Sequence, residues 1–208
     1  MNQNVLADVV QHYGFNLNQN QIQSLFSYLD LLMQWNKVMN LVGPYEWGRV
    51  LEELVLDSFF LWKFIDENYQ IAEDDRVLDL GAGAGLPGIP LRIVWNSGRY
   101  YLVESRTRRA AFMNRALASV RLNNTLVLNC RFQQIEKSIL PARLIISRAF
   151  MPWSELLPQT KEMLAKKGGI IILSSDKYRG QKLDDFGLKC EHVYKVKGKK
   201  RYLWGLEL

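Results

Sequence analysis

The sequence is poor in cysteine and lacks long apolar runs, and both features restrict the class of protein. The two cysteines among the 208 residues, Cys130 and Cys190, do not form a C-x-x-C pair. A disulfide framework and a structural zinc site are therefore not expected. No apolar stretch approaches the ~18 residues of a membrane-spanning helix, and residues 1–5 lack the features of a signal peptide. We expect a cytoplasmic protein that binds neither metal nor membrane.

Acidic residues are fewer than basic ones, 21 against 27, so the net charge is +6. Hydrophobic residues make up 48% of the chain and charged residues 23%, which is typical of a folded soluble protein and argues against disorder. Basic residues gather in two clusters, at 106–121 and 195–201. Such clusters are often solvated faces. In a chain that also carries a glycine-rich motif at residues 81–85, they favour a polyanionic partner such as nucleic acid.

The first part of the chain has a helical pattern. Between residues 4 and 66, apolar residues recur at three- and four-residue steps, as in Ile22, Leu25 and Leu29. A turn signal at residues 40–44 separates two such stretches. We therefore predict an N-terminal helical part, residues 1–66, whose aromatic side chains belong to its core.

From about residue 76, short β-rich runs alternate with helical stretches, which predicts a mainly parallel sheet with helices on both faces. The expected strands are Arg76–Leu80, Tyr100–Glu104, Thr125–Cys130, Leu144–Ser147 and Ile170–Ser174. The expected helices are Ile89–Trp95, Arg108–Val120 and Trp153–Ala165. An antiparallel hairpin, Cys190–Val196 with Arg201–Leu206, is expected at the sheet edge. The predicted class is α/β and Rossmann-like, with residues 67–208 forming the cofactor domain.

A glycine-rich turn comes directly after the first expected strand, where a doubly wound sheet binds its ligand. Glycine is needed there because the backbone turns sharply and a β-carbon would block close approach of a ligand. Dinucleotide sites use G-x-G-x-x-G, whereas Gly81, Gly83 and Gly85 are spaced as G-x-G-x-G after the acidic Asp79. S-adenosylmethionine carries an ammonium, a sulfonium and a carboxylate but no phosphate. Asp79 can serve its cationic end, directly or through water.

Two later strand ends extend this site. Glu104 ends the second strand, where an acidic side chain can accept hydrogen bonds from ribose hydroxyls; a solvated strand end is the alternative. Arg131 and Phe132 come after the third strand, where the adenine would lie. These features predict a class I S-adenosylmethionine-dependent methyltransferase fold. The expected cofactor-binding residues are Asp79, Gly81, Ala82, Gly83, Gly85, Leu86, Glu104, Arg131, Phe132 and Arg148.

The segment after the fourth strand constrains the methyl acceptor. An exocyclic amine usually requires an Asn/Asp-Pro-Pro-aromatic turn, whereas this chain has Ser147-Arg148-Ala149-Phe150. A pyrimidine carbon requires a thiolate, and Cys130 has no evident activating partner. Guanine N7 has a free lone pair and loses no proton, and arginine pairs well with the guanine O6/N7 edge. Arg148 is therefore the catalytic candidate, with an ion pair inside the fold as the alternative.

Several stretches, in order along nearly the whole chain, resemble the RsmG (GidB) family. They are Trp35-Asn36-Lys37 with Asn40-Leu41, Leu56-Asp57-Ser58, Asp79 to Leu91, Glu104-Ser105 followed by Arg109 and Phe112, and Ile146 to Phe150. The resemblance implies methylation of guanosine N7 in bacterial 16S ribosomal RNA, with S-adenosylmethionine as donor. It also implies a Rossmann-like fold with an N-terminal helical part, which Trp35, Asn36 and Asn40 brace against the cofactor domain.

The resemblance implies 16S rRNA or the small ribosomal subunit as partner, and we expect a monomer. The expected RNA contacts are Arg106, Arg109, Lys177, Lys199, Lys200 and Arg201. Two positions depart from the family pattern, because Leu54 and Ser174 stand where the family often has histidine and lysine. Lys177 or Arg179 is a candidate replacement for that lysine. A methyltransferase for another RNA or a small molecule, and a non-catalytic RNA-binding assembly protein, remain open.

Overall fold

The computed structural model describes residues 2–183 and 185–208, so Met1, the first residue of the predicted helical part, lies outside it. The N-terminal part consists of helices α1 (Gln3–His12), α2 (Gln19–Met39), α3 (Trp47–Val50) and α4 (Leu56–Asn68), with a π-helical turn, η1 (Leu51–Val55), between the last two. Helix α2 begins with a capping box between Asn18 and Gln21 and ends at Asn40, whose φ is 49°. The helical pattern in this region is thus confirmed.

The rest of the chain forms a seven-stranded sheet in the order β3-β2-β1-β4-β5-β7-β6. Its strands are β1 (Arg76–Leu80), β2 (Arg99–Val103), β3 (Thr125–Leu128), β4 (Ala142–Arg148), β5 (Leu164–Ser174), β6 (Gly187–Val196) and β7 (Lys199–Glu207). The intervening helices are α5 (Gly88–Val94), α6 (Thr107–Val120) and α7 (Trp153–Thr160), with 3₁₀ turns at Phe132–Gln134, Lys137–Ile139 and Lys161–Met163. β7 pairs antiparallel with both β5 and β6, whereas the other pairs are parallel. The predicted parallel sheet with an antiparallel edge hairpin is confirmed.

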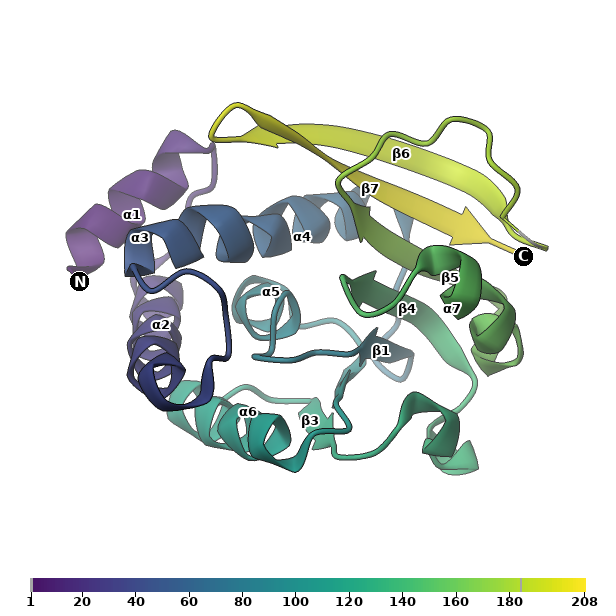
Figure 1. Cartoon of the computed structure of the whole chain (residues 1–208), viewed down its shortest axis with the longest axis horizontal. Helices are drawn as coiled ribbons and strands as arrows, with labels where there is room; N and C mark the ends of the chain where they lie inside the picture. The colour runs from purple at the N-terminus through teal and green to yellow at the C-terminus, as the bar shows by residue number, and fades with distance from the viewer. Residues whose placement is uncertain (1, 184) are drawn as a thin grey trace.

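Alternating side chains of the strands supply two cores. Val77, Tyr100 and Leu144 belong to the core shared with α1, α2, α4, α5 and α6. Leu78 and Ile145, one residue further along their strands, belong to the core that includes α7. Figure 1 shows this arrangement, with α1 to α6 on one side of the sheet and α7 on the other. Helices therefore cover both faces, although unequally. The predicted division after residue 66 falls in the last turn of α4.

The predicted strand ends differ from the observed ones by up to three residues elsewhere, and the largest boundary error lies between α7 and β5. The helix expected over Trp153–Ala165 ends at Thr160, and β5 begins at Leu164 rather than Ile170. The hydroxyl of Thr160, the last residue of the helix, donates to the carbonyls of Leu156 and Leu157, and a 3₁₀ turn follows before the strand. Leu164 then pairs with Ala142, and the register shifts before Gly169 pairs with Leu144. The exposed Lys166 and Lys167 at this irregularity interrupt the apolar run, so a hydrophobicity pattern does not detect the first part of the strand.

The antiparallel hairpin determines which residues meet at the site. The carboxyl ends of β1, β2, β4 and β5 lie at one edge of the sheet. Because β7 runs the opposite way, its first residues reach that same edge, and Tyr202 pairs with Ser174 at the end of β5. The chain near residue 201 therefore joins an edge formed mainly by residues 80–150. No helix of the described residues is long and apolar enough to cross a membrane.

Candidate active site

The turn after β1 requires glycine because of its backbone dihedral angles and because of the side chains packed against it. Gly81, Gly83 and Gly85 have φ of 71°, 59° and 80°, a region that other residues rarely adopt. A β-carbon at Gly81 would collide with the ring of Phe150, and one at Gly85 with Ile89. At Gly83 it would lie 3.5 Å from Nη1 of Arg109. The turn is therefore tightly packed on two sides, and its shape depends on the three glycines.

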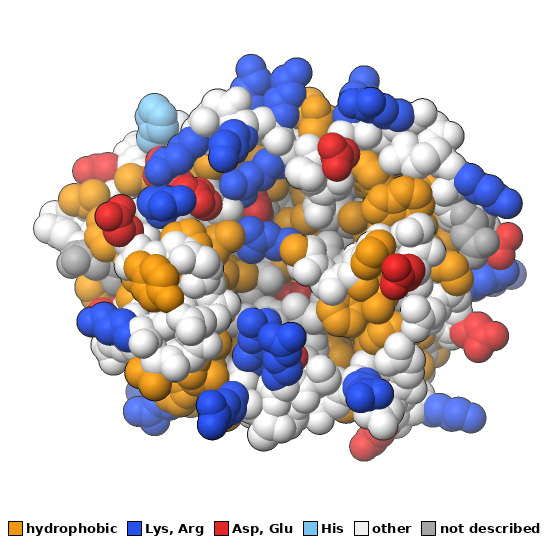
Figure 2. Space-filling view, viewed as in Figure 1, with side chains coloured by type: hydrophobic (Ala, Val, Ile, Leu, Met, Phe, Trp, Pro, Cys, Tyr) orange, Lys and Arg blue, Asp and Glu red, His pale blue; other side chains and the backbone are white. Residues whose placement is uncertain are grey.

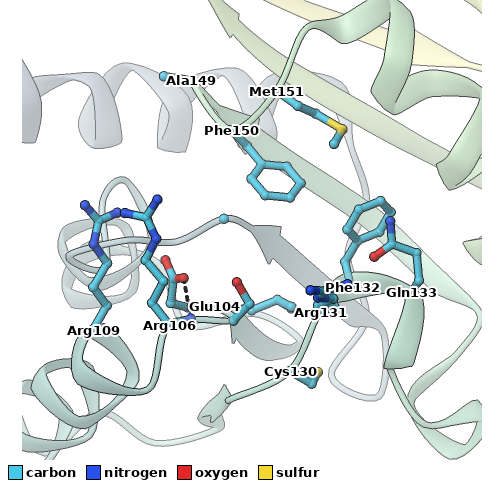
Figure 3. Close-up of a pocket in the computed structure, with 13 residues that line it drawn as sticks. Glu104, Arg106, Arg109, Cys130, Arg131, Phe132, Gln133, Ala149, Phe150 and Met151 are labelled. Atoms are coloured by element: carbon cyan, nitrogen blue, oxygen red, sulfur yellow. Dashed lines mark hydrogen bonds between the residues drawn. The ribbon is translucent and has the colours of Figure 1, made fainter.

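Glu104 fixes this turn from the end of β2. Its Oε2 accepts a hydrogen bond from the Gly83 N–H at 3.1 Å, and its Oε1 accepts one from the Arg106 N–H at 2.8 Å. Figure 3 shows the second of these bonds at the edge of the pocket that Glu104 lines. The residue is only 7% exposed, so it is not a solvated strand end. The carboxylate oxygens keep further lone pairs for a ligand hydroxyl.

Asp79 lies beneath the turn rather than in a pocket. It is 1% exposed, and its Oδ2 accepts a hydrogen bond from the Tyr100 hydroxyl at 3.2 Å. Burial raises the pKa of Asp79 to about 7, while hydrogen bonds from Tyr100 and the Gly88 N–H oppose the increase. A β-carbon at Gly88 would lie 2.5 Å from Oδ2 of Asp79, which explains the glycine there. In this structure the carboxylate joins the start of α5 to β2.

The pocket beside Glu104, here called the Glu104 pocket, has a volume of about 390 Å³. Its far wall is the segment after β3, including Arg131 and Phe132. The rings of Phe132 and Phe150 meet edge to face, with centroids 5.6 Å apart and an interplanar angle of 85°. Figure 3 shows Phe150 pointing into the space between Glu104 and Phe132. A hydroxyl-accepting carboxylate beside apolar rings suits a nucleoside.

A second pocket, here called the glycine-turn pocket, lies on the other side of the turn. It is lined by residues 81–84, the loop 41–43, Arg109 and Arg148. The other backbone N–H groups of the turn each have an acceptor, whereas the N–H of Ala84 has none among the described residues. Two guanidinium groups and an unpaired N–H suit a carboxylate. Together, the two pockets fit the nucleoside and amino-acid ends of S-adenosylmethionine.

A third pocket, the Arg148 pocket, has a volume of about 490 Å³ and is built around a buried carboxylate. Asp57 of α4 lies 3.0 Å from Nη2 of Arg148 and also pairs with Nη1 of Arg201. The hydroxyl of Tyr194 donates to Oδ1 of Asp57 at 2.8 Å. The Asp57 side chain is 5% exposed. One carboxylate thus holds two arginines, and this cluster keeps a net positive charge.

The π-helical turn adds a second acceptor to this cluster. The carbonyl of Glu53, within Leu51–Val55, accepts from Nη1 of Arg201 at 2.6 Å and from Nη2 of Arg148 at 3.4 Å. Such turns leave backbone carbonyls open to side chains, often at functional sites. The expected alternative for Arg148, an ion pair inside the fold, is therefore present. Within residues 2–183 and 185–208, however, its Nε and Nη1 donors have no partner.

The structure brings some expected residues together and leaves others apart. Arg148 and Arg201 line one pocket, so Arg201 lies inside the site rather than on the outer basic surface. Leu54 and Ser174, the two departures from the family pattern, line that same pocket. Sequence reasoning missed the roles of Asp57 and Tyr194. The Leu-Asp-Ser stretch of the resemblance was the available signal for Asp57.

The remaining basic residues surround the site. Arg106 precedes α6, and Arg109, in its first turn, reaches both cofactor-side pockets. Lys199 and Lys200 are exposed where the β6–β7 hairpin turns, and Lys177 is exposed beyond β5. Figure 2 shows basic side chains gathered at the upper left and below a central hollow. No group of three or more possible metal-ligating side chains occurs in the described part of the chain.

Comparison with known proteins decides the family. The family model described as rRNA small subunit methyltransferase G (GidB) matches residues 21–201. The chain belongs to this family. The ribosomal RNA small subunit methyltransferase G of Nitratidesulfovibrio vulgaris (strain DP4) is 39% identical over 201 residues, 97% of this chain and 92% of the relative. Its namesake in Lawsonia intracellularis is 41% identical over 197 residues, 93% of this chain and 90% of the relative. The resemblance is confirmed.

A solved structure supports the fold independently. The crystal structure of a SAM-dependent methyltransferase from Aquifex aeolicus superposes with a TM-score of 0.57 and 17% sequence identity. The match covers 83% of this chain and 98% of that chain. At this identity the likeness concerns the fold alone. The class I methyltransferase fold is therefore confirmed, and S-adenosylmethionine is the methyl donor of the family to which the chain belongs.

Proposed function

We propose that the protein methylates N7 of a guanosine in 16S ribosomal RNA, with S-adenosylmethionine as methyl donor. The relatives from Nitratidesulfovibrio vulgaris and Lawsonia intracellularis are methyltransferases of the small-subunit ribosomal RNA. The observation that carries the proposal is the position of Arg148. Arg148 lines both the glycine-turn pocket and the Arg148 pocket, and its guanidinium is anchored by Asp57 and keeps two donor groups without a partner among the described residues.

We place the methyl donor across the two pockets on either side of the glycine turn. Glu104 would accept hydrogen bonds from the ribose, and Arg131 and Phe132 would border the adenine. The carboxylate would bind the Ala84 N–H and the guanidinium groups of Arg109 and Arg148. When bound, the donor supplies a methyl group on a positively charged sulfur. Gly81, Ala82, Gly83, Gly85 and Leu86 would shape this site, with Asp79 supporting it from below.

We place the target guanine in the Arg148 pocket. One of the two free donors of Arg148, Nε or Nη1, would donate to O6 and orient N7 toward the methyl group, and the other would bind the carboxylate of the methyl donor. N7 attacks with its lone pair and loses no proton, so the chain needs no general base. The chain supplies orientation and exclusion of water. Arg201, with its remaining donors, would hold the same base or its phosphate, because it shares the carboxylate of Asp57.

The ribosomal RNA itself would lie along the basic residues on either side of the site. Arg106 and Arg109 lie on the α6 side, and Lys199 and Lys200 on the hairpin side. Lys177 is the proposed substitute for the lysine that the family often carries at Ser174. We propose that the protein acts as a monomer in the cytoplasm, and light scattering of the purified protein would test the monomeric state.

The direct test uses labelled S-adenosylmethionine and three acceptors. Small ribosomal subunits, naked 16S rRNA and transfer RNA are each incubated with the protein, then digested to nucleosides. We expect labelled 7-methylguanosine from the subunits, the naked rRNA or both. Label in transfer RNA alone would favour the alternative of a different RNA substrate. No 7-methylguanosine with any of the three acceptors would overturn the proposal.

A further inference from the structure

A tyrosine of the N-terminal part holds the glycine turn from behind. Tyr28, in α2, is fully buried, and its hydroxyl donates to the carbonyl of Ala84 at 2.9 Å. Burial raises the pKa of Tyr28 well above its ordinary value of 10, so the phenol remains a donor. Ala84 is the turn residue whose N–H has no acceptor among the described residues. One contact thus fixes a residue that lines the glycine-turn pocket and whose N–H remains available to a ligand.

A second side chain of α2 holds the loop that supplies another wall of this pocket. Asn36 is 0% exposed, and its Oδ1 accepts from the Val42 N–H at 2.9 Å. Its Nδ2 donates to the carbonyl of Pro44 at 3.1 Å. The loop between these bonds supplies Leu41, Val42 and Gly43 to the pocket lining. Both walls of the pocket therefore depend on one helix that lies outside the predicted cofactor domain.

We propose that helix α2 is part of the cofactor site: Tyr28 and Asn36 position the two walls between which the amino-acid end of S-adenosylmethionine binds. This inference rests on the proposed placement of the methyl donor. The ligand chemistry is indicated by the lining, since an unpaired N–H, Arg109 and Arg148 suit a carboxylate. Tyr28 and Asn36 touch the turn and the loop and not the ligand, so they are positioning residues.

The test compares two ligands that differ only at the relevant end. S-adenosylhomocysteine carries the carboxylate and ammonium, whereas 5′-methylthioadenosine has the same nucleoside without them. Tyr28→Phe removes one hydroxyl and leaves the Ala84 carbonyl without its donor. We expect calorimetry to show about tenfold weaker binding of S-adenosylhomocysteine and unchanged binding of 5′-methylthioadenosine. Tyr101→Phe is the matched control, because Tyr101 is 8% exposed and belongs to the second core; it should bind both ligands as the natural protein does.

Asn36→Ala provides an independent variant. It releases the loop 41–43 and should show the same ligand selectivity as Tyr28→Phe, measured well below the melting temperature of each variant. Equal weakening of both ligands would show that α2 acts only through general stability and would overturn the inference. Unchanged binding of both ligands by Tyr28→Phe would also overturn it. If the natural protein bound neither ligand, the proposed cofactor placement itself would fail, and the inference with it.

Discussion

The cofactor half and the acceptor half of the site meet at Ala149, which lines all three pockets and has a φ of 50°. The cofactor half consists of the Glu104 pocket and the glycine-turn pocket, and its central groups come from the strand ends and turns of residues 79–109. The acceptor half is the Arg148 pocket. Its carboxylate and one of its arginines, Asp57 and Arg201, are 144 residues apart.

The two halves differ in where along the chain their binding groups lie. Backbone N–H groups and one carboxylate within a short stretch of chain supply most binding groups of the cofactor half, and the neutral hydrogen bonds of Tyr28 and Asn36 hold its walls. The acceptor half depends on a buried carboxylate that α4 presents to β4 and β7. We therefore expect changes in the acceptor half to affect folding stability strongly, and changes in the cofactor half to affect mainly ligand affinity. Substitutions in the two halves, and in the basic surface around them, test this difference.

The largest effect should result from Asp57→Ala. The substitution leaves Arg148 and Arg201 without their shared carboxylate and should cost about 3–5 kcal/mol of unfolding free energy. Glu52→Ala is the matched control, since Glu52 pairs with Lys197 of the same hairpin at 2.6 Å but at the surface; it should cost under about 1 kcal/mol. Urea unfolding measures both. Equal losses would show that the buried cluster does not join the three segments.

The second prediction concerns pH and Asp79. Its carboxyl has a pKa of about 7 in the folded protein, against an ordinary 3.8. Between these values the folded protein holds a proton that the unfolded chain releases, so stability should fall as the pH rises from 4 to 7, by at most about 1.4 kcal/mol per unit from this group. Above pH 7 its contribution should be constant. In Asp79→Asn this component of the slope should be absent. Identical slopes from pH 4 to 7 in both proteins would contradict the assignment.

The third prediction tests the cofactor half through Glu104→Gln. An amide keeps one acceptor oxygen but places a donor against the N–H of Gly83 or Arg106 or against the ribose. Binding of S-adenosylhomocysteine should weaken by about 10- to 100-fold, with little loss of stability. The exposed Glu136, in the nearby turn, offers Glu136→Gln as control, and calorimetry should show no change there. A Glu104→Gln variant that binds as tightly as the natural protein would remove the carboxylate from the proposed site.

The smallest effect concerns the outer basic residues. If Lys199 and Lys200 contact phosphates, replacing both with alanine should lower the salt dependence of RNA binding by about 1.5–2 logarithmic units per tenfold change in salt. The paired control is Lys166→Ala with Lys167→Ala, which removes the same charge at the irregularity of β5. Affinity measured at several salt concentrations distinguishes the two. Equal slopes for both double variants would mean that the hairpin lysines do not contact phosphates.

Local patterns were enough to predict most of the fold. The alternation of apolar runs with helical periods found the parallel strands and the hairpin, because burial on both faces imposes that pattern. It failed where the lysines of the β5 irregularity interrupt the run, and a helix was extended there instead. The glycine turn and Glu104 were predicted because they lie at strand ends within one short stretch of chain.

The other contacts of the site could not be predicted from spacing. Tyr28 reaches Ala84 across 56 residues, and Tyr194 reaches Asp57 across 137. Neither residue has a distinguishing neighbour in sequence, so only tertiary packing reveals its partner. The two departures from the family pattern were noted as separate substitutions, whereas the structure places Leu54 and Ser174 in one pocket. Both departures therefore lie in the pocket where the target guanine is proposed to bind.

The separation of the two halves is tested most directly at Arg148, the residue that borders both. Arg148→Ala and Arg148→Lys would be compared for methylation of small ribosomal subunits and for binding of S-adenosylhomocysteine. We predict a kcat lower by about 100-fold or more for Arg148→Ala, with partial activity for Arg148→Lys, because lysine keeps the charge without the planar set of donors. Affinity for S-adenosylhomocysteine should change by less than about fivefold, since Arg109 and the Ala84 N–H remain. A loss of cofactor affinity as large as the loss of kcat, or full activity of Arg148→Ala, would contradict this separation.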